Sequence, residues 1–217
     1  LGGRFDVDFA TADVSRAAEL ETVTARAHVE LGPGTVGTLE LTGGAIDGRI
    51  DRGVIVADRF ELRGPAVALT ASGQVGLAPG SASDARYRVE AARLEPIGRL
   101  AGLPLGGAAI VEGTLTGPRE ALVASGTLEG SDVTYAGNGA LDLDSRYRVT
   151  LPDLGAGALR VEAETEATFV KVGPVEVQEV AARTVYGGGE LFFEGSARDR
   201  GRVLEARGTL VLHPDHN

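Results

Sequence analysis

The chain has 217 residues and a formal net charge of −10, with 43% hydrophobic but only 5% aromatic residues. This acidity, and the lack of a basic stripe with interleaved aromatic side chains, argue against nucleic acid as a partner. No cysteine occurs, which excludes disulfides, thiolate nucleophiles and cysteine-ligated metals. The 32 glycines and 9 prolines favour many short strands joined by turns.

The N-terminal half alternates between apolar and polar residues, which is the period of a β-strand with two different faces. In the segment 23–31 every second residue is apolar, and Gly32, Pro33 and Gly34 end the run. The longest clean alternation in this half covers 67–77. The pattern predicts strands near 5–9, 23–31, 39–41, 46–50, 54–56, 60–62, 67–77 and 87–91.

One segment changes period. Its apolar residues Leu94, Ile97, Leu100 and Ala101 recur every three to four positions, with Pro96 near the start and Gly102 at the end. Proline in the first turn and glycine just past the last are typical helix boundaries. The spacing predicts one short helix near 94–101.

Strand character then returns and continues to the C-terminal region. The clearest strand is 159–169, where the odd positions are apolar or small and the even positions include Glu162, Glu164 and Glu166. We interpret the three carboxylates as a solvated face rather than an active site. The pattern predicts strands near 110–115, 122–128, 133–135, 141–151, 159–169, 175–177, 180–186, 191–193 and 204–212.

Four of these strands share a glycine template. An apolar residue is followed at intervals of two by a second apolar residue, a glycine and a third apolar residue. The segments are 69–75, 122–128, 191–197 and 204–210. Because glycine on the apolar side of a strand favours a bend or a close approach, we expect these glycines to help the sheet curl.

Patterns that would support catalysis or metal binding are not found. His28 lies on a polar strand face, and the tail residues His213 and His216 have no zinc-site spacing. Asp47 and Asp51 lack the calcium-loop pattern. Nucleophile elbows and phosphate-binding glycine loops are likewise missing. We therefore expect a protein that is not an enzyme and uses no cofactor and no metal.

A long sheet with one apolar face has three stable options. It can pack on a second sheet, close on itself, or curl and leave a groove. One two-turn helix is too small to cover such a surface. A groove lined mainly by Leu, Val and Ala suits an acyl chain, since each buried CH₂ contributes about 0.8 kcal/mol. A tightly packed sandwich with a closed core remains the alternative.

Three segments together resemble the AsmA/TamB-type proteins of Gram-negative cell envelopes. They are LEPIGRLAGLPLGG at 94–107, EGTLTGP at 112–118 and ASGTLEGSDVTY at 124–135. The resemblance is clearest over 94–151. It implies an elongated, U-shaped sheet with an apolar interior, and a role in lipid transport between the inner and outer membranes or in outer membrane biogenesis.

On this basis we expect an all-β fold, namely an elongated, curled (U-shaped, taco-like), mostly antiparallel sheet with an apolar concave face. Residues 1–217 would form a single β-groove segment of a larger protein, with a candidate sub-boundary near 79–84. No uncharged apolar run approaches the roughly 18 residues of a membrane span, and no signal peptide is found. Any membrane anchor is therefore expected outside this segment, and the resemblance implies an inner-membrane anchor and a location in the periplasm. The alternative is a structural or adhesive β-sandwich or β-solenoid domain.

The expected partners are phospholipid acyl chains, and an outer-membrane barrel protein is a further candidate that the resemblance implies. The proposed lipid-binding residues share an apolar strand position on the longest strands. They are Val67, Leu69, Val75, Leu77, Leu141, Leu143, Tyr147, Val149, Leu151, Leu159, Val161 and Phe169.

Overall fold

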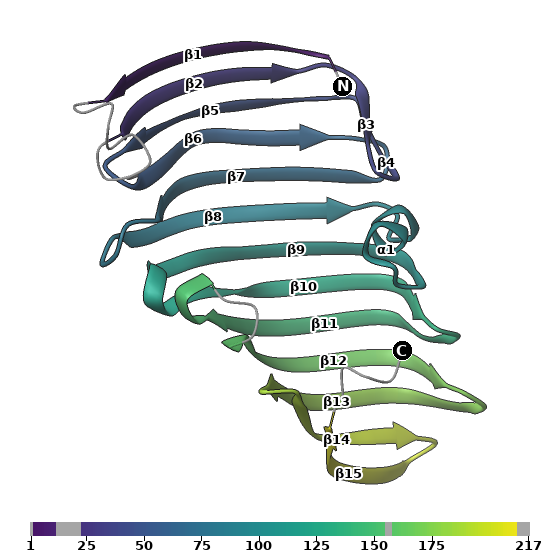
Figure 1. The fold of residues 1–217 in the computed structure, drawn as a ribbon. Helices are drawn as coiled ribbons and strands as arrows, with labels where there is room; N and C mark the ends of the chain where they lie inside the picture. The colour runs from purple at the N-terminus through teal and green to yellow at the C-terminus, as the bar shows by residue number, and fades with distance from the viewer. Residues whose placement is uncertain (1, 12–22, 155–157, 212–217) are drawn as a thin grey trace.

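The computed structural model of the chain describes residues 2–11, 23–154 and 158–211. Thirteen strands form one antiparallel sheet whose spatial order follows the sequence, so each strand pairs with the next (Figure 1). Among the described residues, the first strand pairs only with the second and the last only with the one before it. The sheet is therefore not closed, and the expectation of an all-β, mostly antiparallel fold is confirmed.

The strands are long for a sheet of this size, and most connections are tight turns. A separate two-stranded hairpin, β3–β4, is inserted between the second and third strands of the sheet. The bounds are β1 Gly3–Thr11, β2 Val23–Leu31, β3 Gly34–Val36, β4 Leu39–Leu41, β5 Gly43–Asp51, β6 Val54–Arg63, β7 Val67–Gly76, β8 Ala82–Ala91, β9 Leu105–Pro118, β10 Leu122–Tyr135, β11 Asn138–Leu151, β12 Arg160–Val172, β13 Val175–Gly187, β14 Glu190–Asp199 and β15 Arg202–Val211.

Three strands of the sheet were each expected as two shorter ones. In β6 and β10 the register shifts, between Ala57 and Phe60 and between Ser131 and Thr134. A bulge changes the phase of the side-chain alternation, so a continuous strand looks like two strands in the sequence. β13 also runs unbroken, although its apolar positions change phase after Val177.

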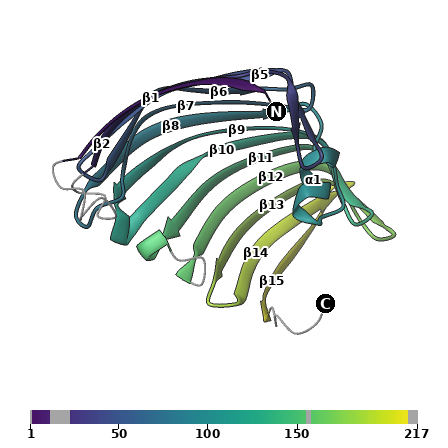
Figure 2. The same cartoon turned by 45° about the horizontal axis from the view of Figure 1, so that its top comes forward.

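The expected helix is present as α1, Glu95–Ala101, with proline in its first turn and Gly102 in the left-handed conformation at its end. It lies at one end of the sheet beside the β3–β4 hairpin (Figures 1 and 2). The hydroxyl of Thr38 donates a 2.6 Å hydrogen bond to the carbonyl of Pro96, which ties the hairpin to the helix. Leu41 and Ala66 are buried at this end, so a small core forms there.

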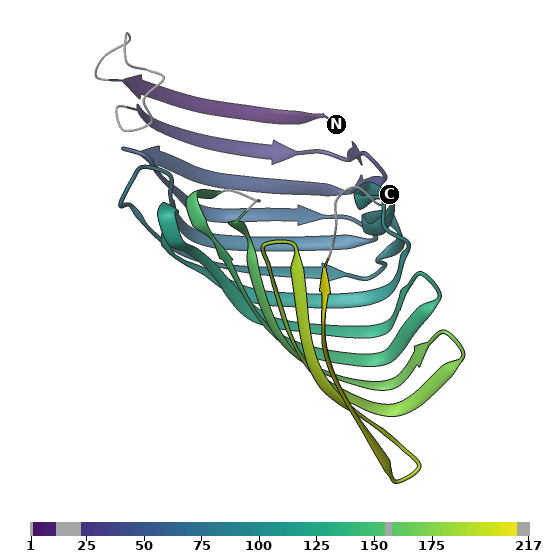
Figure 3. The same ribbon diagram turned by 60° about the horizontal axis from the view of Figure 1, so that its bottom comes forward.

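The described residues form essentially one layer. Buried positions are few and mostly small, and no large side chain among them is fully buried. Apart from Pro96 and several glycines, they are Leu41, Ala66, Ala78, Ser83, Ala91 and Leu122. The strand direction also rotates steadily across the sheet, so β14 and β15 run steeply relative to β1 (Figure 3). This rotation is the usual twist of a sheet accumulated over many strands.

The loop near 79–84, where the sequence suggests a sub-boundary, joins β7 to β8. These two strands pair over most of their length in the same sheet, from Val67 opposite Ala91 to Gln74 opposite Asp84.

Candidate functional site

The register assigns side chains to two faces, because residues directly opposite each other on neighbouring strands share a face. We name these faces after two neighbours on β8, the Tyr87 face and the Arg88 face. From β2 to β15, the row through Tyr87 reads Val29, Ile46, Phe60, Ala71, Tyr87, Gly113, Gly126, Tyr147, Ala163, Thr184, Phe193 and Gly208.

Two further rows lie on either side of this central row on the Tyr87 face. One reads Leu31, Gly44, Leu62, Leu69, Val89, Val111, Leu128, Ser145, Thr165, Ala182, Gly195 and Ala206. The other reads Ala27, Gly48, Ala57, Gly73, Ala85, Leu115, Ala124, Val149, Val161, Tyr186, Leu191 and Leu210. None of the three rows contains a charged residue.

Two of the polar side chains in these rows bond to each other across neighbouring strands. Ser145 and Thr165 are cross-strand partners, and their hydroxyl oxygens lie 2.9 Å apart. Among the described residues, no buried side-chain nitrogen or oxygen lacks a hydrogen-bond partner. Ser145, which interrupts the apolar pattern of its strand in the sequence, is thereby accommodated without an unpaired polar group.

A pair of tyrosines occupies the middle of the central row. The hydroxyl oxygens of Tyr87 on β8 and Tyr147 on β11 are 2.6 Å apart, although two strands lie between them. The Tyr147 hydroxyl also lies 3.3 Å from the carbonyl oxygen of Glu112, to which it can donate. Partial burial and the hydrogen bond to Tyr87 raise the pKa of Tyr147. The pair therefore forms a polar bridge within rows that carry no charged residue.

Glycine makes this bridge possible. A Cβ atom on Gly113 would lie 2.7 Å from both tyrosine hydroxyls, which is closer than real Cβ contacts. The same relation recurs at Gly208, where a Cβ atom would lie 2.8 Å from the Phe193 ring. At these positions the absence of a glycine side chain leaves room for an aromatic side chain from a neighbouring strand.

This finding refines the expectation for the glycine template. Gly208 is a template position, and it is covered by a ring. Gly73, another template position, has φ +120° and lies beside the bulge of β6. The template glycines therefore have at least two roles. One leaves room for an aromatic ring, and another lies beside a bulge.

Most of the proposed lipid-binding residues do share one face. Val67, Leu69, Val75, Leu143, Tyr147, Val149, Leu151 and Val161 are paired positions on the Tyr87 face. Leu77 and Leu159 lie just outside β7 and β12, and both are partly covered. The set forms two groups, one on β7 and one on β11 and β12, with β8 to β10 between them.

Phe169 and Leu141 differ from the expected regular row. The ladder between β11 and β12 is interrupted between the pairs Asp142–Thr168 and Gly139–Lys171. Within this gap Phe169 has φ +47° and is 65% exposed, and Leu141 is 44% exposed. The strict alternation expected up to Phe169 is therefore wrong at its last position, because a left-handed backbone breaks the pleat there.

The residues that sequence reasoning missed lie on the strands between the two groups. Val89, Val111, Leu115 and Leu128 connect β7 to β11 across the same face. Each belongs to an alternating run in the sequence, so the signal was present. Their strands look shorter in the sequence than they are, which hid their continuity with the longer ones.

The Arg88 face has the opposite character. Its central row reads Glu61, Thr70, Arg88, Glu112, Thr127, Arg146, Glu164, Arg183, Glu194 and Arg207. From Arg146 onward the charge alternates in sign from one strand to the next. Glu164 and Glu166 are exposed, as expected for a solvated row, and Glu162 is partly covered and bonds to Arg160.

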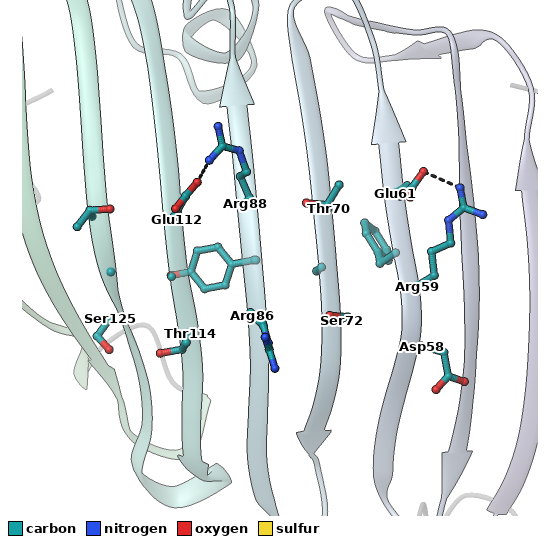
Figure 4. Close-up of a pocket in the computed structure, with 16 residues that line it drawn as sticks. Asp58, Arg59, Glu61, Thr70, Ser72, Arg86, Arg88, Glu112, Thr114 and Ser125 are labelled. Atoms are coloured by element: carbon teal, nitrogen blue, oxygen red, sulfur yellow. Dashed lines mark hydrogen bonds and ion pairs between the residues drawn. The ribbon is translucent and has the colours of Figure 1, made fainter.

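A shallow, open hollow of about 690 Å³ lies on the Arg88 face (Figure 4). Its walls carry the ion pairs Arg88–Glu112 and Arg59–Glu61. Hydrogen bonds from Arg59 and Arg63 lower the pKa of Glu61 to about 2. Its charged groups are thus largely paired with one another and exposed to solvent.

His28 also lies on the Arg88 face, beside Asp47 of the next strand. The hydrogen bond and the charge of Asp47 raise the pKa of His28. The side chains remain about half exposed and one-third exposed, respectively. We interpret the pair as a surface contact between β2 and β5.

No metal cluster and no membrane-spanning helix are found in the part of the chain that the structure describes. There, no group of three or more His, Asp or Glu residues is placed to hold a metal ion. Nor is any helix in that part both long and apolar enough to cross a membrane. His213 and His216 lie outside the described residues.

Comparison with known proteins finds no family model, no curated protein and no solved structure that matches the chain. The AsmA/TamB-type resemblance therefore stays a prediction, and the function is argued below from the two faces of the sheet.

Proposed function

We propose that this chain is a non-catalytic module that shields the acyl chains of phospholipids along the Tyr87 face while their head groups stay in water. The observation that carries the proposal is the run of three adjacent rows without a charged residue across the sheet. Extended surfaces without charge on a folded protein tend to mark sites of interaction.

The open form of the sheet supports this proposal. Besides the short two-stranded β3–β4 hairpin, the described residues provide only one seven-residue helix that could cover the Tyr87 face. The strands also bow along their length in Figure 2. We propose that this curvature makes the Tyr87 face the concave, apolar side of a trough. A linear acyl chain in the trough would contribute about 0.8 kcal/mol for each CH₂ removed from water.

The small side chains of the face fit a guest of this shape. Alanine and glycine recur in all three rows, and the Tyr87 hydroxyl and the Phe193 ring lie close to Gly113 and Gly208 of the neighbouring strands. Because small side chains occupy little space, they leave room for an acyl chain along the rows. The proposal extends to a periplasmic, AsmA/TamB-like lipid conduit between inner and outer membranes, with an outer-membrane barrel protein as a candidate partner.

The test introduces a carboxylate into the Tyr87 face. Leu143→Asp and Val161→Asp each place a charge in the Tyr87 face, where it would repel an acyl chain or require water beside it. We expect both variants to lose most of the lipid that co-purifies with the wild-type protein, measured by mass spectrometry of extracted lipid, and to lose photo-crosslinking to an acyl-chain probe.

Val123→Asp is the matched control, because Val123 pairs with Thr116 and Thr150 on the opposite face. It should keep lipid capture at the wild-type level, with circular dichroism showing that all three variants fold. Undiminished lipid capture by both Leu143→Asp and Val161→Asp would overturn the proposal that the Tyr87 face binds lipid. A lipid-free wild-type protein that binds no fluorescent fatty acid would favour the structural or adhesive alternative.

A further inference from the structure

A hollow of about 420 Å³ lies at one end of the sheet, where the β10–β11 turn meets β12. The side chains that matter in its lining are Val133, Leu141, Phe169, Lys171 and Asp132. It is separate from the large hollow of Figure 4, which is lined by residues of β6 to β10. The sequence did not indicate this feature.

The backbone around the hollow is unusual. Three non-glycine residues there have positive φ angles: Asp132 at +50°, Ala136 at +49° and Phe169 at +47°. Such conformations are energetically unfavourable and tend to cluster at binding sites. For an aromatic residue the left-handed conformation is rare. The hollow therefore lies where the ladder between β11 and β12 is interrupted and the backbone leaves the regular strand conformation.

The lining is amphipathic. Leu141 and Phe169 are large, apolar and exposed. Leu141 is two positions from Leu143 on the same strand, so the apolar wall is continuous with the Tyr87 face. A ligand that covered these two side chains would remove apolar surface from water without rearranging the sheet.

One cation faces this space. Lys171 is the only lysine of the chain, in a protein of net charge −10. Its cross-strand neighbours are Gly139 and Glu176. Among the described residues, neither Glu176 nor Asp132 forms an ion pair with it, whereas six arginines of the strands form ion pairs on the Arg88 face. An ammonium group beside exposed apolar side chains suits the head of an anionic amphiphile.

We propose that this hollow binds the anionic head group of an amphiphile. The Lys171 ammonium donates hydrogen bonds to a carboxylate or phosphate oxygen, and the acyl chain lies over Leu141 and Phe169 toward Leu143. The inference rests on the proposed function and adds to it a class of ligand, a head-group position and an end of the trough at which the chain enters. Asp132 lines the same hollow and opposes the anion, so it limits the affinity.

The experiment compares ligands that carry the same type of hydrocarbon chain but differ in their head groups. Purified protein is titrated with oleate, oleoyl lysophosphatidylglycerol, oleyl alcohol and inorganic phosphate, with displacement of a fluorescent fatty acid as the readout. Lys171→Gln should weaken the binding of oleate and of the lysophospholipid about fivefold and leave oleyl alcohol unchanged, since only the charge-assisted hydrogen bond is lost. Asp132→Asn, which suits a left-handed backbone, should strengthen binding of the two anions.

Arg52→Gln is the matched control, because it removes one positive charge from the β5–β6 turn at the far end of the strands and should change no affinity. Phosphate alone should not bind measurably, because it lacks the chain. Equal affinity of wild type and Lys171→Gln for both anions would overturn this inference while binding of oleyl alcohol sustained the proposed function. If the wild type bound neither the anions nor oleyl alcohol, both would fall.

Discussion

Gly113 illustrates how a single missing side chain shapes the Tyr87 face. It lies between Tyr87 and Gly126 in the central row, and both tyrosine hydroxyls lie where its Cβ atom would be. The close approach allows two side chains from strands three apart to bond directly. Glycine has an entropic cost within a strand, which the buried ring surface and the hydrogen bond offset.

We expect Gly113→Ala to destabilise the protein by about 1–3 kcal/mol, because the methyl group displaces both hydroxyls or forces the backbone to move. The measurement is the midpoint of urea unfolding. Gly187→Ala is the control, since a Cβ atom there would meet its nearest neighbour at 3.8 Å and the residue has no positive φ. That variant should be neutral or slightly stabilising. A similar midpoint for the two variants would contradict the role of Gly113.

At the scale of elements, the strands are joined by more than backbone hydrogen bonds. On the Arg88 face the five positions Arg146, Glu164, Arg183, Glu194 and Arg207 lie side by side on β11 to β15 and alternate in sign. Each pair of neighbouring strands from β11 to β15 therefore places opposite charges side by side in this row. A strand that shifted by one residue would lose these pairs and turn its apolar side chains to water.

Arg183→Glu tests this row, because it places three carboxylates side by side on β12, β13 and β14. We expect a loss of roughly 0.5 kcal/mol for each repulsive pair in low salt. The loss should shrink as salt is raised, since these side chains are exposed and salt screens them. Arg183→Gln, which removes attraction without adding repulsion, should have a smaller effect. An identical effect of both variants in low and high salt would speak against an electrostatic role for the row.

At the scale of the whole molecule, a single-layer sheet has two edges and two faces to protect. Among the described residues, β15 pairs only with β14 and exposes Leu204 and Leu210, at 70% and 51%. Edge strands with free backbone groups and apolar side chains pair readily with other strands.

We therefore expect concentration-dependent self-association of the protein, measured by sedimentation velocity. Leu204→Lys should weaken it several-fold, because a lysine on an edge strand opposes pairing. Leu100→Lys, which places the same charge on α1 at 53% exposure and away from the edge, is the control. Association that responds equally to both variants would mean that the edge is not responsible.

Local patterns in the sequence foretold much of the fold. The period of two identified nearly all strands, and a proline and a glycine at the right spacing marked α1. The misses have a common cause, since bulges and left-handed residues such as Asp132 and Phe169 change the phase of the alternation. Such irregularities depend on neighbouring strands, so a single strand's sequence does not show them.

The candidate site was predictable only in part. That Val149 and Val161 lie on apolar sides of their strands follows from the strand period. That they face each other, and that Lys171 lies beside exposed Phe169 and Leu141, depends on the pairing of β11 with β12 and on the break in their ladder.

By itself the sequence determined the strand period, the position of the helix and the separation of apolar from charged side chains, because these follow from local backbone geometry and side-chain chemistry. The tertiary structure alone decided that the strands form one open layer in chain order. It also decided that Tyr87 meets Tyr147, 60 residues away, over a glycine. The same alternation suits a sandwich and an open sheet equally well, so only long-range pairing could distinguish them.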